Sequence, residues 1–73
     1  MRTGFIKWFS SRRNYGFIRY NNELGKWYEV FVHGSSINFN VRDGDFVCFQ
    51  MKDTLRGPKA VNVRKGKKVI EVA

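Results

Sequence analysis

The stretches that decide the fold are Arg-Asn-Tyr-Gly-Phe-Ile-Arg-Tyr at residues 13–20 and Val-Phe-Val-His at residues 30–33. In an extended strand, the side chains of residues i and i+2 lie on the same face of the sheet. In the first stretch, Tyr15 and Phe17 therefore share one face while Ile18 lies on the other. Because aliphatic side chains are the natural core residues, we predict that the two rings lie on the outer face of a sheet.

The second stretch repeats this pattern. Phe31 and His33 share one face, and Val30 and Val32 share the opposite one. The two valines are expected to enter the core, which leaves the phenyl ring and the imidazole outside. A sheet that buries its aliphatic side chains and displays its rings is suited to stacking on flat ligands such as nucleobases.

Hydrophobic spacing is strand-like along the whole chain, and only residues 35–37 are expected to form a helical turn. Segments rich in aromatic and β-branched residues, separated by turn residues, predict strands at about residues 3–10, 15–20, 27–33, 45–51 and 59–65. Turns are expected at residues 10–14, 21–26, 42–45 and 54–58. We predict one all-β domain over residues 1–73, a small five-stranded antiparallel barrel with a basic tail from about residue 64. We expect the core of this barrel to include Phe5, Phe46 and Phe49.

The charge balance is strongly basic. The chain has 14 Lys and Arg against 6 Asp and Glu, a net charge of +8, which favours anionic partners such as nucleic acid or a membrane surface. Aromatic residues make up 16% of the chain, more than so small a core can hold, which again predicts displayed rings. No apolar run reaches the length of a signal peptide or a membrane span, and we expect a cytoplasmic protein.

The sequence offers little for catalysis or metal binding. Cys48 is the only cysteine, so it cannot form an internal disulfide or a zinc site alone, and it is interpreted as a packing residue. His33 is the only histidine, and no nucleophile, carboxylate pair or metal-ligand spacing accompanies it. No phosphate-binding loop or dinucleotide glycine pattern is present. We therefore expect neither an enzyme nor a bound metal or cofactor.

The first three predicted strands carry rings that can form one platform if these strands are neighbours: Trp8 with Phe9, Tyr15 with Phe17, and Phe31 with His33. Stacking a ring on a base is worth about 1–3 kcal/mol and tolerates any base. Trp8 and Phe9 cannot both face outward from a regular strand, so a bulge or a twist is expected near Phe9. Basic side chains near these strands are candidates for holding phosphates: Lys7, Arg12, Arg13, Arg19 and Arg56.

Four motifs follow one another along the chain: Lys7-Trp8-Phe9, Tyr15-Gly16-Phe17-Ile18, Val30-Phe31-Val32-His33, and Gly57-Pro58 with Ala60, Asn62 and Val63. In this order and spacing the chain resembles the cold-shock domain, whose pattern runs K-W-F-N, G-F/Y-G-F-I, V-F-V-H and G-P-x-A-x-N-V. The resemblance covers nearly the whole chain. It implies an antiparallel barrel of the OB-fold type that binds single-stranded RNA and DNA, often as an RNA chaperone or a cold-induced regulator.

Carried over position by position, the resemblance implies nucleic-acid contacts by Lys7, Trp8, Phe9, Tyr15, Phe17, Phe31 and His33. Arg13 takes the place of a Lys that precedes the first aromatic motif, and Arg56 that of a basic residue in the last loop. Phe39 is matched with an aromatic residue that the family keeps in the loop after the third strand. The implied partner is single-stranded RNA or DNA, pyrimidine-rich, bound by a monomer.

The chain also departs from the family pattern. Asn14 replaces a usual Gly, and since Asn tolerates positive φ the turn is expected to survive. Gly34 stands where bacterial members usually carry Phe, so one stacking ring is expected to be missing. The loop between the second and third strands is a few residues longer and carries Trp27 and Tyr28.

Three other classes of binding protein share features with this sequence. An RNA-recognition motif fits part of residues 13–20, but that fold needs two helices, which the spacing does not predict. An interfacial membrane binder is expected to be an amphipathic helix. A small β-barrel adaptor that binds a protein or a Pro-rich peptide through its aromatic groove is the alternative that stays open.

Overall fold

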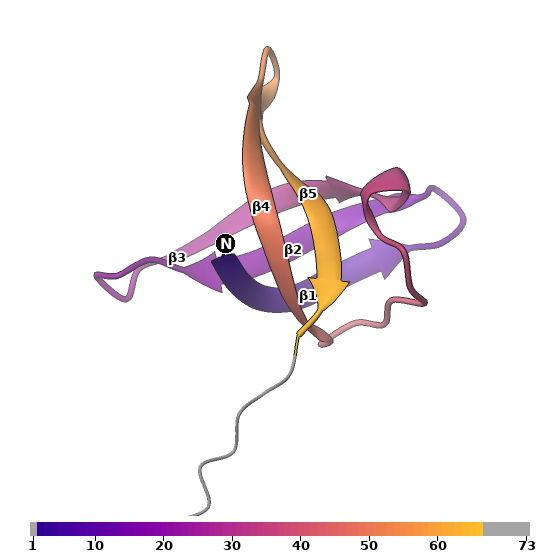
Figure 1. The fold of residues 1–73 in the computed structure, drawn as a ribbon, viewed down its shortest axis with the longest axis horizontal. Coiled ribbons are helices and arrows are strands. Elements are labelled where there is room, and N and C mark those ends of the chain that lie inside the picture. The colour runs from indigo at the N-terminus through magenta and orange to yellow at the C-terminus, as the bar shows by residue number, and fades with distance from the viewer. Residues whose placement is uncertain (1, 67–73) are drawn as a thin grey trace, which may run out of the picture.

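The computed structural model, shown in Figure 1, describes residues 2–66. Its strands are β1 (Arg2–Ser10), β2 (Tyr15–Asn21), β3 (Trp27–His33), β4 (Phe46–Thr54) and β5 (Gly57–Lys65), and a 3-10 turn, η1 (Gly34–Ser36), follows β3. The predicted strands and the single helical turn are thus confirmed, with bounds that differ by up to three residues. Trp27 and Tyr28, which the family resemblance placed in the loop before the third strand, belong to β3. Of the predicted basic tail, the first residues belong to β5, and residues 67–73 lie outside the described part.

The strands close into a barrel in the order β1-β2-β3-β5-β4, which confirms the predicted fold class. The β1–β2, β2–β3, β4–β5 and β1–β4 pairs are antiparallel. Closure comes from a short parallel contact between β3 and β5, at Phe31 opposite Lys59 and Val32 opposite Ala60. Figure 1 shows the β2–β3 hairpin extending to the left and the β4–β5 hairpin rising at the top.

The core is aliphatic, with one fully buried phenyl ring. Ile18, Val30 and Val32 are buried as the alternation predicts, and Phe49 is the largest fully buried side chain. The assignment of Phe5 to the core is wrong, because Phe5 is 37% exposed and pairs with the half-buried Phe46 ring at 5.5 Å. Phe5 lies opposite Arg19 in β2, and Arg19 shares its face with Phe17, so the alternation turns Phe5 outward too.

A bulge in β1 separates the two neighbouring aromatic residues, as predicted. Ile6 pairs with Ile18, but Trp8 pairs with Phe17, so Lys7 is the extra residue. The bulge turns Trp8 to the outer face that Phe17 occupies. Phe9 then lies opposite the buried Gly16 and packs against the core.

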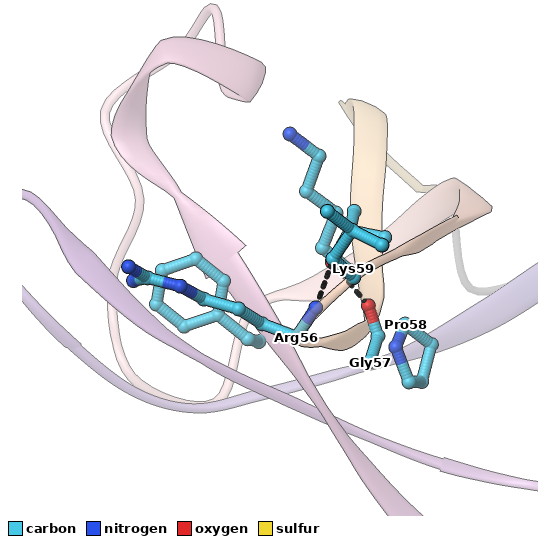
Figure 2. A pocket seen from close by; sticks show the side chains of 7 residues that line it. Arg56, Gly57, Pro58 and Lys59 are labelled. Atoms are coloured by element: carbon cyan, nitrogen blue, oxygen red, sulfur yellow. Dashed lines mark hydrogen bonds between the residues drawn. The ribbon is translucent and has the colours of Figure 1, made fainter.

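The β4–β5 turn is tighter than the sequence predicted. Only residues 55–56 form the turn, and Gly57 and Pro58 already belong to β5. The hydroxyl of Thr54 donates to the carbonyl of Gly57 at 2.6 Å and accepts from the backbone N–H of Arg56 at 3.2 Å, which closes the turn (Figure 2). The hairpin therefore carries strand structure as far as its tip.

Candidate nucleic-acid interface

Four aromatic rings on the outer faces of β1, β2 and β3 contact one another and are called here the four-ring platform: Trp8, Tyr15, Phe17 and Phe31. The Trp8 ring centroid lies 5.4 Å from those of Tyr15 and Phe17. The Phe31 ring centroid lies 5.7 Å from that of Tyr15 and 6.0 Å from that of Phe17. These separations are typical of favourable aromatic pairs, so the rings hold one another in place before any ligand arrives.

The platform is supported from below and open from above. Phe17 and Phe31 lie directly opposite each other on β2 and β3, while their neighbours Ile18, Val30 and Val32 fill the core beneath. All four rings are half-buried, since each packs against its neighbours but keeps part of its surface exposed. Exposed flat surface held rigid by a sheet is what base stacking requires.

His33 extends the platform next to Tyr15, its cross-strand partner. The imidazole Nδ1 accepts the backbone N–H of Ser35 at 3.1 Å and lies 2.9 Å from the Ser35 hydroxyl. His33 thus caps η1, and the cap fixes the plane of the ring. The side chain stays exposed, so a fixed ring is available beside the platform.

A hollow of about 670 Å³ adjoins the platform at the β4–β5 hairpin, and Phe31 belongs to both. Figure 2 shows Arg56, Gly57, Pro58 and Lys59 along its wall, with the Arg56 and Lys59 side chains extending from the hairpin. The two cations give the hollow positive charge beside an aromatic surface. This combination can hold the phosphate of a nucleotide whose base lies on the rings.

The sequence did not single out Lys59, although it lies opposite Phe31 in the parallel β3–β5 contact. The alternation in β5 could have indicated this position, because Ala60 is buried and its neighbour Lys59 therefore faces outward. Its position beside the rings depends on barrel closure. That long-range pairing is not encoded in local spacing.

The other predicted cations lie around the platform. Lys7 projects from the β1 bulge and forms an ion pair with Glu29, and the two side chains are 46% and 43% exposed. An exposed pair of this kind contributes little stability, so a phosphate can compete for the ammonium group. Arg12 and Arg13 are exposed in the turn that leads to Tyr15.

Phe9 and Phe39 lie away from the four-ring platform. Both are half-buried and pack against the core, and they line a separate hollow of about 440 Å³ with Ile37, Val41 and the β1–β2 turn. The structure therefore brings Trp8, Tyr15, Phe17, Phe31 and His33 together and leaves Phe9 and Phe39 apart. Lys7 and Arg56 lie on elements beside these rings, and Arg13 lies in the turn before Tyr15.

Asn14 and Gly34 meet between the β1–β2 turn and η1. Asn14 has φ 60°, in the left-handed region that Asn tolerates, so the turn survives as expected. The backbone N–H of Gly34 donates to the Asn14 carbonyl at 2.9 Å. A Cβ on residue 34 would lie 1.8 Å from the Asn14 Oδ1, so the Asn14 side chain occupies the space that a side chain at 34 needs.

Two further findings bear on the class of site. Within residues 2–66, no group of three or more His, Cys, Asp and Glu side chains is placed to hold a metal ion. The same residues include no helix with the length and apolar character needed to cross a membrane.

Comparison with known proteins identifies the family. The model of the 'Cold-shock' DNA-binding domain matches residues 2–66. Similar relatives include the cold shock-like protein CspD of Bacillus cereus, 39% identical, with 89% of this chain and 98% of the relative covered. The major cold shock protein of Streptococcus pyogenes serotype M1 is 38% identical, with 89% of this chain and 97% of the relative covered. The cold shock protein CspA of Staphylococcus aureus (strain USA300) is also 38% identical, with 89% of this chain and 98% of the relative covered. The chain therefore belongs to the cold-shock domain family of nucleic-acid-binding proteins.

Proposed function

We propose that this protein binds single-stranded RNA or DNA without catalysis, by stacking successive bases on the four-ring platform. The observation that carries the proposal is the closed circuit of four half-buried rings on one sheet face, with ring centroids 5.4 to 6.0 Å apart. Every base has a π-face, so such a surface accepts many sequences. A paired base has its faces covered by its neighbours in the duplex, so unpaired strands are the ligand that fits.

The cations around the rings supply the second half of the mechanism. Lys7, Arg13, Arg56 and Lys59 surround the platform, and each can neutralise a phosphate of the bound strand. Lys7 exchanges Glu29 for the phosphate when the strand binds. His33, held by its cap on η1, offers a further ring at the end of β3.

The biological consequence of this binding is passive. A protein that binds only unpaired strands shifts weak RNA hairpins toward the open form by mass action, with no need for ATP. The role is that of an RNA chaperone acting as a monomer in the cytoplasm on pyrimidine-rich strands. The similar relatives are named as cold shock proteins, which supports this role.

The test is a titration of single-ring variants with oligothymidine and oligouridine. Phe31→Ala and Phe17→Ala are each expected to weaken binding about fivefold to 150-fold, the equivalent of the 1–3 kcal/mol of one stacked base. Leu24→Ala is the control, since Leu24 is 91% exposed on a hairpin loop, away from the platform. If variants that remain folded by thermal melting bind both oligonucleotides as tightly as the unmodified protein, the stacking mechanism is wrong.

A second candidate is supported by the hollow at the β4–β5 hairpin, whose wall includes the apolar residues Phe31, Leu55 and Pro58. An aromatic groove with such a wall can hold a Pro-rich peptide, as an adaptor barrel would. Tryptophan fluorescence separates the two functions. Quenching by a Pro-rich peptide and none by oligouridine would favour the adaptor.

A further inference from the structure

The face that carries the platform continues along the β2–β3 hairpin beyond the platform itself. Opposite residues on the two strands form successive outward pairs: Tyr15 with His33, Phe17 with Phe31, Arg19 with Glu29, and Asn21 with Trp27. Trp27 therefore lies on the same face as Phe31. Four residues at about 3.3 Å each place it about 13 Å further along the strand.

This part of the hairpin projects from the barrel. Arg19 is the last residue of β2 that pairs with β1, so β2 and β3 continue past it as a two-stranded ribbon (Figure 1). Trp27 lies on this ribbon and is 48% exposed. The neighbouring Tyr28 faces the other way and stacks on Tyr20 at 5.7 Å, so the end of the core is closed without Trp27.

The charges on this face leave a cation next to the indole. Glu29 lies opposite Arg19, but its carboxylate is bound by Lys7, and this is the one ion pair found within residues 2–66. The Arg19 guanidinium instead lies over the Trp27 ring, 5.3 Å from its centroid. The pair thus combines an exposed indole with a guanidinium that no carboxylate neutralises in the described part of the chain.

We propose that Trp27 and Arg19 form a second stacking site for single-stranded nucleic acid, which holds the part of a longer strand that leaves the four-ring platform. This inference rests on the proposed function. A base stacks on the exposed indole, and the guanidinium, weakly hydrated and planar, contacts the adjacent phosphate or stacks on the base. The evidence for a strand as occupant is the continuity of the face with the platform and its positive charge.

The proposal makes affinity depend on strand length. A strand of about four nucleotides fills the platform, whereas one of about ten also reaches Trp27, within the range of about 4–16 nucleotides that one barrel of this type covers. The short strand is therefore an internal reference for the platform. The long strand reports on the platform and on Trp27 together.

The experiment measures both affinities for the full chain with oligothymidine of the two lengths. Trp27→Ala is expected to weaken binding of the long strand about fivefold or more, with a small effect on the short one. Trp27→Phe, which keeps a ring, is expected to restore most of the affinity. Leu24→Ala, which removes exposed apolar surface from the same hairpin, is the control and is expected to change neither affinity.

Contact between the strand and Trp27 can be measured directly by fluorescence in the Trp8→Phe variant, in which Trp27 is the only tryptophan left. Its fluorescence is expected to respond to the long strand and not to the short one. The inference is overturned if Trp27 fluorescence does not change when either strand is added. It is also overturned if Trp27→Ala binds the long strand as tightly as the unmodified protein. Failure of the proposed function looks different, because Phe31→Ala would then leave the affinity for both lengths unchanged.

Discussion

At the scale of single residues, the side chain at Asn14 accounts for the absence of a side chain at Gly34. The family pattern has Gly at the position of Asn14, and bacterial members usually carry Phe at the position of Gly34. This chain therefore has the larger side chain at residue 14 and none at residue 34. The Asn14 side chain lies where a Cβ on residue 34 would be, 1.8 Å from its Oδ1. The Asn14 side chain therefore fills space that a side chain at residue 34 would need.

This reversal predicts coupling between the two positions. Gly34→Phe alone is expected to destabilise the fold, because the phenyl group must displace the Asn14 side chain, and Asn14→Gly is expected to remove the obstacle. A double-mutant cycle in urea is therefore expected to give a coupling free energy of at least about 0.5 kcal/mol that favours the double variant. Additive effects would show that the two positions are independent.

The face on which a side chain lies could be predicted from alternation where the strand is regular, but not where a bulge interrupts it. Ile18, Val30 and Val32 lie in regular strands, and their burial was predicted from spacing alone. Trp8 and Phe9 follow the bulge, and the sequence indicated that one was needed without placing it at Lys7. Phe5 was assigned to the core by residue type, although its strand position turns it outward.

At the scale of elements, β5 contains an irregularity that its sequence motif explains. The pairing with β4 shifts between Cys48 and Gln50, and Asn62 beside the shift has φ 51°. The Asn62 amide donates to the Gln50 Oε1 at 2.7 Å. The asparagine of the G-P-x-A-x-N-V motif thus has a structural role here, because it stabilises a bulge that bends β5 around the barrel.

Substitution of Asn62 tests this role. Asn62→Ala is expected to lower the free energy of unfolding by about 1–2 kcal/mol, since alanine disfavours the left-handed region, and Asn62→Gly is expected to cost less. Urea unfolding measures both, with Arg64→Ala, an exposed residue of the same strand, as the control. A glycine variant less stable than the alanine variant would contradict the backbone explanation.

Strand positions were predictable from the alternation, but the tip of the β4–β5 hairpin was not. Residue type predicts that Gly57 and Pro58 lie in the loop, because both usually interrupt strands. Pro58 is tolerated because it precedes the first β5 residue that pairs with β3, Lys59, so one edge of β5 is still free at that point. The parallel closure of the barrel, which brings Lys59 to Phe31, left no local signal in the sequence.

At the scale of the whole molecule, the net charge of +8 acts together with the placement of the rings. Lys7, Arg56 and Lys59 lie on elements beside the platform, and Arg13 lies in the turn before Tyr15, while Arg64 lies at the end of β5 opposite the hairpin tip. Total charge could be counted from the sequence. Which cations reach a bound strand depended on the fold, so their separate contributions are a property of the structure.

The salt dependence of binding distinguishes local contacts from total charge. Each phosphate neutralised on a single strand changes the slope of log K against log salt by about −0.7, so a strand long enough to contact all four cations around the platform is expected to give a slope near −2.8 from those contacts. Arg56→Gln is expected to reduce the magnitude of that slope by about 0.7, because it removes one phosphate contact. Arg64→Gln makes the same change in net charge and is expected to leave the slope unchanged. Equal slopes for the two variants would mean that the general positive field attracts the strand, and the assignment of Arg56 to a phosphate would be wrong.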